Sequence, residues 1–514
     1  MKCAMLILSP CSFISVVLEL CRLQIVYGHD SLSDEKVWIM VNRDIETKLR
    51  SLQIITSPPS VPSTFRAGST SRYLISPNDK MLLQVSNNIS FNSSLSPITT
   101  ASSSQNIHAV KESTISQDSA QNFVMIPVSE GDILNVTKFL HRKERRCSGF
   151  VTFETSDEAK KYIKKYETAN RSPVPFPCSI NNWEATNRIK NIVNPRRIWK
   201  TANKLVYDFQ NRYYDSASGL QVPSWIKDRW KAIAKEREDI TVELYDHKPA
   251  FKQNSVVLTI QGSSLTQKKD IVIIGAHLDS ITGWSRYMEK DERAPGADDN
   301  ASGIAVLTET LEVIVQGGFK PDKTIKIIAF AAEEVGLRGS KSIASHYRSK
   351  EYNVIGMLNF DMVGYTDSRK DIFIYLDDTN QGQNSFLETL LRTYMPDIKV
   401  GHSRCGSPCS DHHSWHVERY PASYVSDSKL EAPPPNYHTM NDKFVSQEHM
   451  SKFARLAVIY LSEHAKLTPS ATTPIQKTND VSKNVAATKT LYTTMTYYES
   501  ILYTLRIIIN FQYY

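Results

Sequence analysis

The sequence lacks an apolar run long enough to form a transmembrane helix. Crossing a bilayer takes about 18 to 20 consecutive apolar residues, and polar or charged residues interrupt both apolar ends of this 514-residue chain, 1–20 and 491–514. We therefore predict no transmembrane span. The hydrophobic fraction of 41% and the charged fraction of 22% are ordinary for a globular protein. They exclude collagen-like, wholly disordered and multi-span membrane classes.

A surplus of positive charge is missing where a nucleic-acid-binding face would need it. The chain has a net charge of +7, but residues 178–467 contain 37 Lys and Arg against 36 Asp and Glu, a net of +1. A folded domain that binds nucleic acid usually presents a basic face. We therefore exclude nucleic acid as a partner.

Cysteine is scarce, with seven residues in the chain. Residues 1–28 contain Lys2 and an apolar run, a pattern typical of a secretory signal peptide, although a poorly ordered N-terminus is the alternative. Removing this segment leaves an even number of cysteines, which suits an oxidising compartment. We therefore predict a secreted, extracellular protein, and the sequons at Asn88, Asn92 and Asn135 add weak support. The four remaining cysteines are Cys147, Cys178, Cys405 and Cys409.

The composition changes along the chain and predicts several segments. Residues 29–122 are predicted to be low in complexity and disordered, because 86–120 is rich in Ser, Thr, Asn and Gln. Residues 123–177 are predicted to form a small α+β module with the order strand, helix, strand, helix. It contains the basic run HRKERR (141–146), which is either a solvated loop or a processing site. Residues 468–514 are predicted to be a flexible tail.

Residues 178–467 are predicted to form one α/β domain with a mostly parallel central sheet flanked by helices. Buried-type strands alternate with amphipathic helices, which is the pattern of such a fold. Helices are expected over 201–214, 222–236, 302–318, 385–394 and 444–465, and strands over 255–262, 270–280, 324–334, 354–365, 371–378 and 421–428.

Side chains that can bind metals follow several of the predicted strands. In such sheets, ligands bind at the carboxyl ends of the strands. Each residue considered alone also has an ordinary structural explanation, such as capping a helix. Together, unpaired carboxylates at one sheet edge would repel each other unless cations neutralised them. Two histidines with three carboxylates suit zinc, and five ligands with one shared carboxylate serve two ions. The candidates are His277, Asp279, Asp298, Asp299, Glu333, Glu334, Asp361 and His438.

Six motifs in this order resemble those of the secreted bacterial leucyl aminopeptidases, which are co-catalytic di-zinc exopeptidases. They are AHLDS, APGADDNASG, AAEEVGLRGS, NFDMVGY, CGSPCSDHHSWH and YHTMND, and the resemblance covers roughly residues 180–467. It implies two Zn²⁺ ions per chain and an aminopeptidase that acts on peptide or protein N-termini with apolar first residues. We expect a monomer.

The resemblance also implies roles for individual residues. His277 and Asp361 would hold one zinc, Glu334 and His438 the other, and Asp299 would bridge them. Glu333 would be the general base, and Asp279 would orient the His277 imidazole. Asp298 is the less suitable ligand of its pair.

The CGSPC loop is predicted to be closed by a disulfide between Cys405 and Cys409, as in the family. The family has a tyrosine between these cysteines where this chain has Ser407, and its pocket aromatics align with Ser426 and Leu430. Met362 and Tyr437 still supply apolar surface, so the substrate pocket is expected to be apolar without a fixed preference for leucine. His412, His413 and His416 could suggest a third metal, but a structural loop is the preferred interpretation.

The 123–177 module is predicted to be a pro-segment that covers the active-site mouth, with Cys147 and Cys178 as possible partners that tether it. Two alternatives to the aminopeptidase remain open. One is a related exopeptidase or a single-zinc glutaminyl cyclase, and the other is an inactive relative that serves as a receptor or scaffold. The complete set of ligands disfavours both.

Overall fold

The computed structural model of the chain describes residues 36–55, 123–140, 149–171, 174–176, 179–282, 291–366 and 369–469. The strands are β1 (Lys36–Asn42), β2 (Phe123–Ser129), β3 (Val151–Phe153), β4 (Ile240–Tyr245), β5 (Ser255–Ile260), β6 (Asp270–His277), β7 (Phe319–Pro321), β8 (Thr324–Phe330), β9 (Asn353–Phe360), β10 (Ile372–Tyr375), β11 (Val400–Ser403), β12 (Ala422–Ser426) and β13 (Leu467–Pro469). The helices are α2 (Arg43–Ser51), α3 (Glu130–Phe139), α4 (Ser156–Arg171), α5 (Trp183–Ile189), α6 (Pro195–Asp208), α7 (Val222–Ala234), α8 (Gly303–Gln316), α9 (Arg338–Ser349), α10 (Gln381–Tyr394), α11 (His412–Val417) and α12 (Gln447–His464), with the short 3-10 helix η3 (Lys190–Ile192) and the irregular turn η5 (Ala297–Ser302).

An eight-stranded sheet with the order β11-β10-β12-β9-β6-β8-β5-β4 forms the centre of the larger domain. Four of its seven neighbouring pairs are parallel, and these include the central pairs of β6 with β8 and with β9. The central strands are rich in Ile, Val and Ala and are almost entirely buried, as expected for parallel strands covered on both faces. The predicted α/β fold is therefore confirmed.

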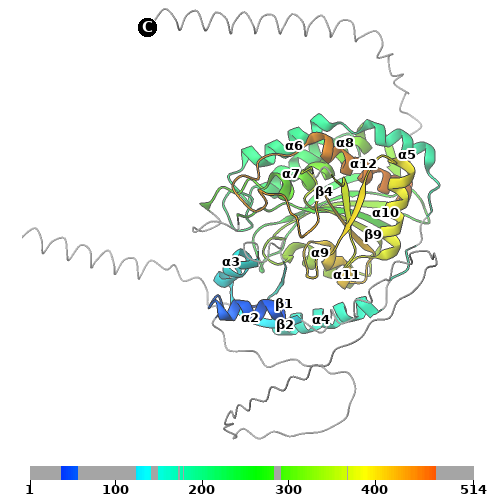
Figure 1. Cartoon of the computed structure of the whole chain (residues 1–514). Coiled ribbons are helices and arrows are strands. Elements are labelled where there is room, and N and C mark those ends of the chain that lie inside the picture. Colours follow the sequence, from blue (N-terminus) through cyan, green and yellow to red (C-terminus); the bar gives the residue numbers. More distant parts are fainter. Residues whose placement is uncertain are drawn as a thin grey trace, which may run out of the picture.

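Helices cover both faces of this sheet (Figure 1). On one face, α5, α6, α7, α8, α10 and α12 pack into the largest apolar cluster. On the other face, α9 and α11 contribute Ile343, Tyr347 and Trp415 to a separate cluster. None of the helices in the described part of the chain has both the length and the apolar character that a membrane span requires.

The helix predicted over 201–214 is wrong at both ends. Helix α6 starts earlier, at Pro195, where the Asn194 side chain accepts a hydrogen bond from the Arg196 backbone N–H. It ends at Asp208, so the NRYY sequence that follows is a loop. The reason lies in tertiary contacts: the backbone N–H of Arg212 donates to Ser280 Oγ at 3.1 Å instead of to a carbonyl one helical turn earlier.

A second, three-stranded sheet with the order β2-β1-β3 forms the small module. Residues 123–171 of this module have the expected order of strand, helix, strand and helix. The prediction of a disordered segment over 29–122 is wrong for residues 36–55, which form β1 and α2. Strand β1 is the central strand of this sheet, and its partners are more than 80 residues away in sequence, so no local periodicity reveals it.

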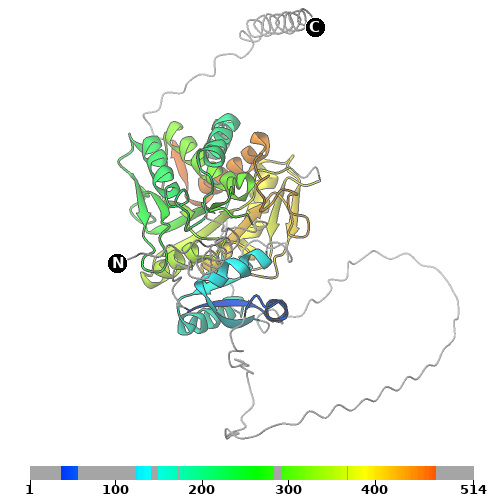
Figure 2. The ribbon, with the colours of Figure 1, turned by 90° about the vertical axis from the view of Figure 1, so that its left-hand side faces the viewer.

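The small module packs against the larger domain beside α9 and α11, opposite the face that carries α8 and α12 (Figures 1 and 2). The two parts share apolar clusters: Met40, Val151 and Phe153 pack with Leu337 and Val417 of the larger domain. Ion pairs flank this contact, among them Arg338 with Glu130 and Glu154. The module and the larger domain therefore share buried apolar surface.

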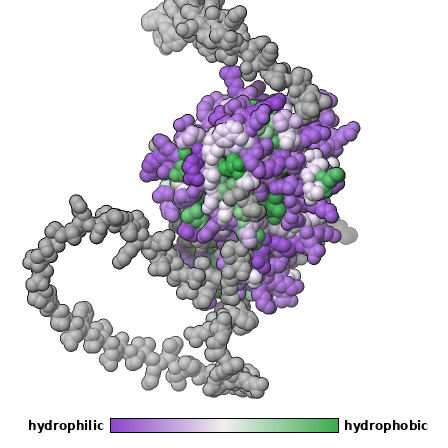
Figure 3. Space-filling model, turned by 90° about the vertical axis from the view of Figure 1, so that its right-hand side faces the viewer, coloured by the Kyte–Doolittle hydropathy of each residue, from purple (hydrophilic) through white to green (hydrophobic). Residues whose placement is uncertain are grey.

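Several predicted features lie outside the described residues. These are the signal peptide, the HRKERR run, Cys147, Cys178 and nearly all of the tail. On the side of the molecule that Figure 3 shows, the described surface is mainly hydrophilic, with small and separate hydrophobic areas.

Candidate metal centre

The carboxyl ends of three neighbouring strands bring most of the predicted metal ligands together. His277 is the last residue of β6, Asp361 follows β9, and Glu333 and Glu334 lie in the turn after β8. Asp279 lies two residues after β6, and the remaining candidates come from the irregular turn η5 and from the loop before α12. Each of these side chains is at most 2% exposed: His277, Asp279, Asp299, Glu333, Glu334, Asp361 and His438.

Asp299 lies between the two histidines. Its Oδ1 atom is 3.0 Å from His277 Nε2, and its Oδ2 atom is 2.7 Å from His438 Nε2. His277 Nε2 is also 3.2 Å from Asp361 Oδ1, and His438 Nε2 is 3.2 Å from Glu334 Oε2. The carboxylate of Asp299 therefore joins two sets of possible ligand atoms.

Among the described residues, three groups could each hold a metal ion, since their ligand atoms lie within 4.8 Å of one another. Two of them, His277–Asp299–Asp361 and Asp299–Glu334–His438, are the sets that the sequence motifs imply for two ions. The third is His277 with Glu333 and Glu334, so Glu333 lies close enough to the cluster to act on a molecule bound there.

The donor set fits divalent zinc. Imidazole nitrogen and carboxylate oxygen are ligand types that zinc prefers, and a buried cluster with more carboxylates than histidines needs positive charge. Burial raises the pKa of Glu333 well above its ordinary value, and burial together with the Asp299 carboxylate raises that of Glu334 to about 8. Burial alone would also raise the pKa of Asp299, but hydrogen bonds from His277 and His438 hold it below its ordinary value.

Asp279 connects the first histidine to the turn after β8. Its Oδ1 atom is 3.4 Å from His277 Nδ1 and accepts a hydrogen bond from the backbone N–H of Glu333 at 3.0 Å. Its Oδ2 atom accepts from the backbone N–H of Glu334 at 3.1 Å. This single carboxylate fixes both the imidazole and the two adjacent glutamates.

Asp298 lies in a different environment from its neighbour. Its Oδ1 atom accepts a hydrogen bond from the Gly364 backbone at 2.7 Å. It belongs to none of the three candidate metal groups found among the described residues.

The structure adds residues that the sequence analysis did not single out. Ser410 Oγ donates to Asp361 Oδ2 at 2.6 Å and accepts from Asn359 Nδ2 at 2.8 Å. Asp442 accepts hydrogen bonds from the backbone N–H groups of Asp298 and Asp299. Both lie within or next to recognised motifs, but nothing in the sequence shows that they fold back onto the ligand loops.

The predicted disulfide between Cys405 and Cys409 is present, with the Cα atoms 6.0 Å apart. The two cysteines pack with Phe373, Tyr375 and Tyr424, and Leu430 lies against this cluster.

The other predicted pocket residues form a second group. Met362 and Tyr437 make an apolar pair, and the Tyr437 ring stacks on that of His438. Ser426 Oγ donates to the Met362 carbonyl at 3.0 Å, whereas the buried Ser407 has a long contact of 3.5 Å with the Cys405 carbonyl.

The histidines of the SDHHSWH motif make separate structural contacts. His413 Nδ1 is 2.8 Å from Asp378 Oδ2, the His412 ring stacks on Tyr424, and His416 Nε2 is 2.9 Å from Asn170 Oδ1. None of them belongs to a candidate metal group in the described part of the chain.

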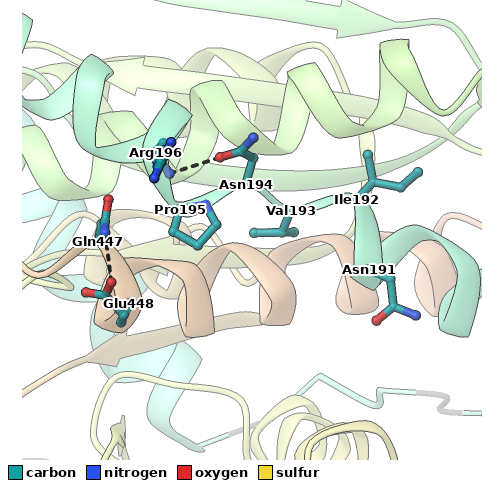
Figure 4. A pocket seen from close by; sticks show the side chains of 8 residues that line it. All are labelled: Asn191, Ile192, Val193, Asn194, Pro195, Arg196, Gln447 and Glu448. Carbon is teal, nitrogen blue, oxygen red and sulfur yellow. Dashed lines mark hydrogen bonds between the residues drawn. The ribbon is translucent and has the colours of Figure 1, made fainter. Parts of the chain in front are cut away.

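A cavity of about 540 Å³ lies away from this cluster, between the start of α6 and the start of α12 (Figure 4). Its walls include Asn194, Pro195 and Glu448. None of its eight lining residues belongs to the metal cluster, so the cavity has no part in the chemistry considered below.

Comparison with known proteins identifies the family. Residues 255–461 match the model of peptidase family M28, a range that contains every candidate metal ligand. Leucine aminopeptidase 1 of Arthroderma gypseum is 31% identical over 379 residues, 70% of this chain and 96% of that protein. Leucine aminopeptidase 1 of Arthroderma otae is 34% identical over 311 residues, 57% of this chain and 80% of that protein.

A solved structure supports the fold. LapB from Legionella pneumophila superposes with a TM-score of 0.62 over 84% of this chain and 100% of that chain, at 24% identity. The fold, the buried cluster and these relatives together define a metallo-aminopeptidase. The chain belongs to peptidase family M28.

Proposed function

We propose that the protein is a secreted, zinc-dependent aminopeptidase that removes apolar residues from peptide N-termini. The observation that carries this proposal is the position of Asp299, with one oxygen 3.0 Å from His277 and the other 2.7 Å from His438. A carboxylate placed in this way can serve two metal ions at once.

The proposed ligands follow from the two sets that share Asp299. His277 and Asp361 would complete one ion's set, and Glu334 and His438 the other's. When bound, zinc polarises a peptide carbonyl and lowers the pKa of a water molecule towards neutrality. Ser410 and Asp279 would hold Asp361 and His277 in orientation through the hydrogen bonds described above.

Glu333 is the proposed general base. Its side chain is buried beside the ligands, and burial raises the pKa of its carboxyl group, which favours uptake of a proton from the attacking water. The same carboxyl group can then deliver the proton to the leaving amine. Asp279 supports this role because it fixes the backbone of Glu333.

The substrate side chain is proposed to bind against the apolar groups around the disulfide. Leu430 packs beside Cys405 and Cys409, and Met362 with Tyr437 forms a separate apolar group that is proposed to contribute as well. Such surface favours an apolar first residue. The requirement for a free N-terminal amine rests on the family relationship.

The small module is proposed to be a pro-segment that restricts access to the site. Thr152 Oγ1 donates to the carbonyl of Val335, which directly follows Glu334, and the Gly149 backbone N–H donates to the Pro408 carbonyl in the disulfide loop. Both contacts join the module to loops that border the metal cluster. The sequon residue Asn135 is exposed on α3, as a glycosylated position in a secreted protein must be.

A substrate panel tests the proposed function. The purified chain is incubated with aminoacyl p-nitroanilides whose first residue is Leu, Met, Phe, Lys or Glu, and with N-acetyl-leucyl p-nitroanilide. Hydrolysis of the apolar members that a chelator abolishes and zinc restores supports the proposal. Hydrolysis of the acetylated compound at an equal rate would contradict an aminopeptidase, and no hydrolysis by a zinc-loaded chain would favour the inactive relative.

A further inference from the structure

Arg212 is a fully buried arginine whose guanidinium group donates hydrogen bonds to backbone carbonyls. Its Nε atom is 2.9 Å from the Leu278 carbonyl, Nη1 is 2.5 Å from that of Pro295, and Nη2 is 2.8 Å from that of Gly296. Arg212 belongs to the NRYY loop after α6, outside the range that matches the family model. A planar guanidinium suits this task because its donors point in fixed directions.

The three carbonyls belong to two segments that carry proposed metal ligands. Leu278 lies between His277 and Asp279, while Gly296 lies three residues before Asp299. One side chain therefore links the end of β6 to the loop that leads into η5. A further connection runs through Ser280, which accepts from the Arg212 backbone N–H and donates to the Ala294 carbonyl.

Gly296 allows this close approach. Its φ is +47°, and a Cβ atom there would lie 2.2 Å from the Asp299 carbonyl oxygen and 2.8 Å from Arg212 Nη2. Any larger residue would push the guanidinium group away from the loop. The local conformation of the ligand loop and the position of Arg212 therefore depend on each other.

The positive charge of Arg212 is also placed where the site needs it. Burial lowers the pKa of its guanidinium group, the nearby carboxylates of Asp442, Asp299, Asp279 and Glu334 oppose this effect, and the resulting pKa of about 10 keeps the group charged at neutral pH. A buried charge bonded only to carbonyls is costly unless opposite charges lie near it. Here those charges are the carboxylates of the metal cluster and of Asp442, which holds the Asp299 backbone.

We propose that Arg212 is a positioning residue for the metal centre. It fixes the His277–Asp279 segment relative to the Asp299 loop, so that the ligand atoms are already arranged before a metal binds. This inference rests on the proposed zinc site. It implies that the NRYY loop, which precedes the range matched by the family model, contributes to the affinity for zinc.

Two variants of the full chain test this role. Arg212→Met removes the charge and all the side-chain donors, whereas Arg212→Lys keeps the charge but cannot reach three carbonyls in fixed directions. The matched control is Arg197→Met on α6, which loses a part-buried ion pair with Glu309 of α8. Zinc affinity is measured by competition with a chromophoric chelator, after circular dichroism has shown that each protein is folded.

We expect both Arg212 variants to bind zinc about tenfold or more weakly, the range found when residues that orient metal ligands are replaced. Arg197→Met should lower the unfolding temperature yet keep wild-type zinc affinity. Wild-type affinity in either Arg212 variant would overturn the inference, and Arg212→Lys provides the test if Arg212→Met does not fold. Failure of the wild-type chain itself to bind zinc would instead contradict the proposed function.

Discussion

Asp279 Oδ1 lies 3.0 Å from the backbone nitrogen of Glu333, and the same oxygen is 3.4 Å from His277 Nδ1. One carboxylate thus sets both the orientation of a proposed metal ligand and the backbone of the proposed base. The other oxygen of Asp279 accepts a hydrogen bond from the backbone N–H of Glu334. One side chain therefore holds the backbone of both glutamates, for which we propose different roles. The chemistry proposed for each can be separated by substitution.

Glu333→Ala should keep zinc but lose turnover. Glu333 is proposed to transfer protons, and general acid–base groups typically contribute about 10²–10⁴-fold in rate. The measurement is kcat on leucyl p-nitroanilide together with zinc content by elemental analysis. Near wild-type activity would show that Glu333 is not the base, and loss of zinc would make it a ligand instead.

Cutting the chain between HRKERR and SPVPFP should raise activity. The module, whose Thr152 and Gly149 contact loops at the site, is proposed to restrict access. A protease recognition site inserted after Arg171 allows one preparation to be assayed before and after cleavage, and the uninserted chain treated with the same protease is the control. Because the module shares apolar clusters with the domain, size-exclusion chromatography should show whether the cut piece leaves. Equal activity after its release would make the module an accessory domain.

The disulfide should affect specificity more than stability. Only three residues separate Cys405 from Cys409, so the closed loop is shorter than the 15-residue loop for which chain entropy gives about 3 kcal/mol. The Asp377 carboxylate also holds this loop, accepting from the backbone N–H groups of Cys405 and Gly406.

We therefore expect the double variant Cys405→Ser and Cys409→Ser to unfold near the wild-type temperature but to show an altered order of preference among aminoacyl p-nitroanilides. A large drop in unfolding temperature with an unchanged preference would make the bridge a structural element without a part in specificity.

His464 should make the protein less stable as the pH falls. It is buried at the end of α12, with Nε2 3.1 Å from the Ile355 carbonyl, and burial lowers the pKa of its ring to about 3. Below pH 6.5 the unfolded chain takes up a proton at this histidine that the folded chain does not. The free energy of unfolding therefore decreases as the pH falls.

The loss is about 1.4 kcal/mol for each pH unit below 6.5. His464→Gln cannot titrate and can still donate to Ile355. Urea unfolding at pH 7.5 and pH 5.5 should therefore show a smaller loss for this variant than for the wild type, by about 1.4 kcal/mol. Other buried histidines are present in both proteins and cancel in the comparison. Equal losses would show that His464 takes up protons in the folded state.

Much of the larger domain could be predicted because its signals are local. The strand that ends in His277 and the strand that precedes Asp361 are largely apolar, and the order of parallel strands brings their carboxyl ends to one edge. The motifs then indicated the ligand types. The structure adds the distances that join the two histidines through Asp299.

What could not be predicted depends on contacts between distant segments. Strand β1 has too little local periodicity to stand out, and it forms only because β2 and β3 pair with it. From its sequence, the NRYY loop is predicted to continue α6. In the structure, Arg212 instead donates hydrogen bonds to Ser280 Oγ and to backbone carbonyls beside the ligand loops. Asp442 likewise gains its role only when the loop after His438 folds back onto Asp299.

The number of zinc ions bound per chain, compared between the wild type and Asp299→Ala, tests the central claim most directly. Asp299 is proposed to serve both ions through its two oxygens. Elemental analysis after dialysis should give two zinc ions for the wild type and at most one for Asp299→Ala, with aminopeptidase activity lost in the variant. Two zinc ions retained by Asp299→Ala would contradict the account, and the shared ligand would then have to be sought elsewhere, with Asp298 as the next candidate.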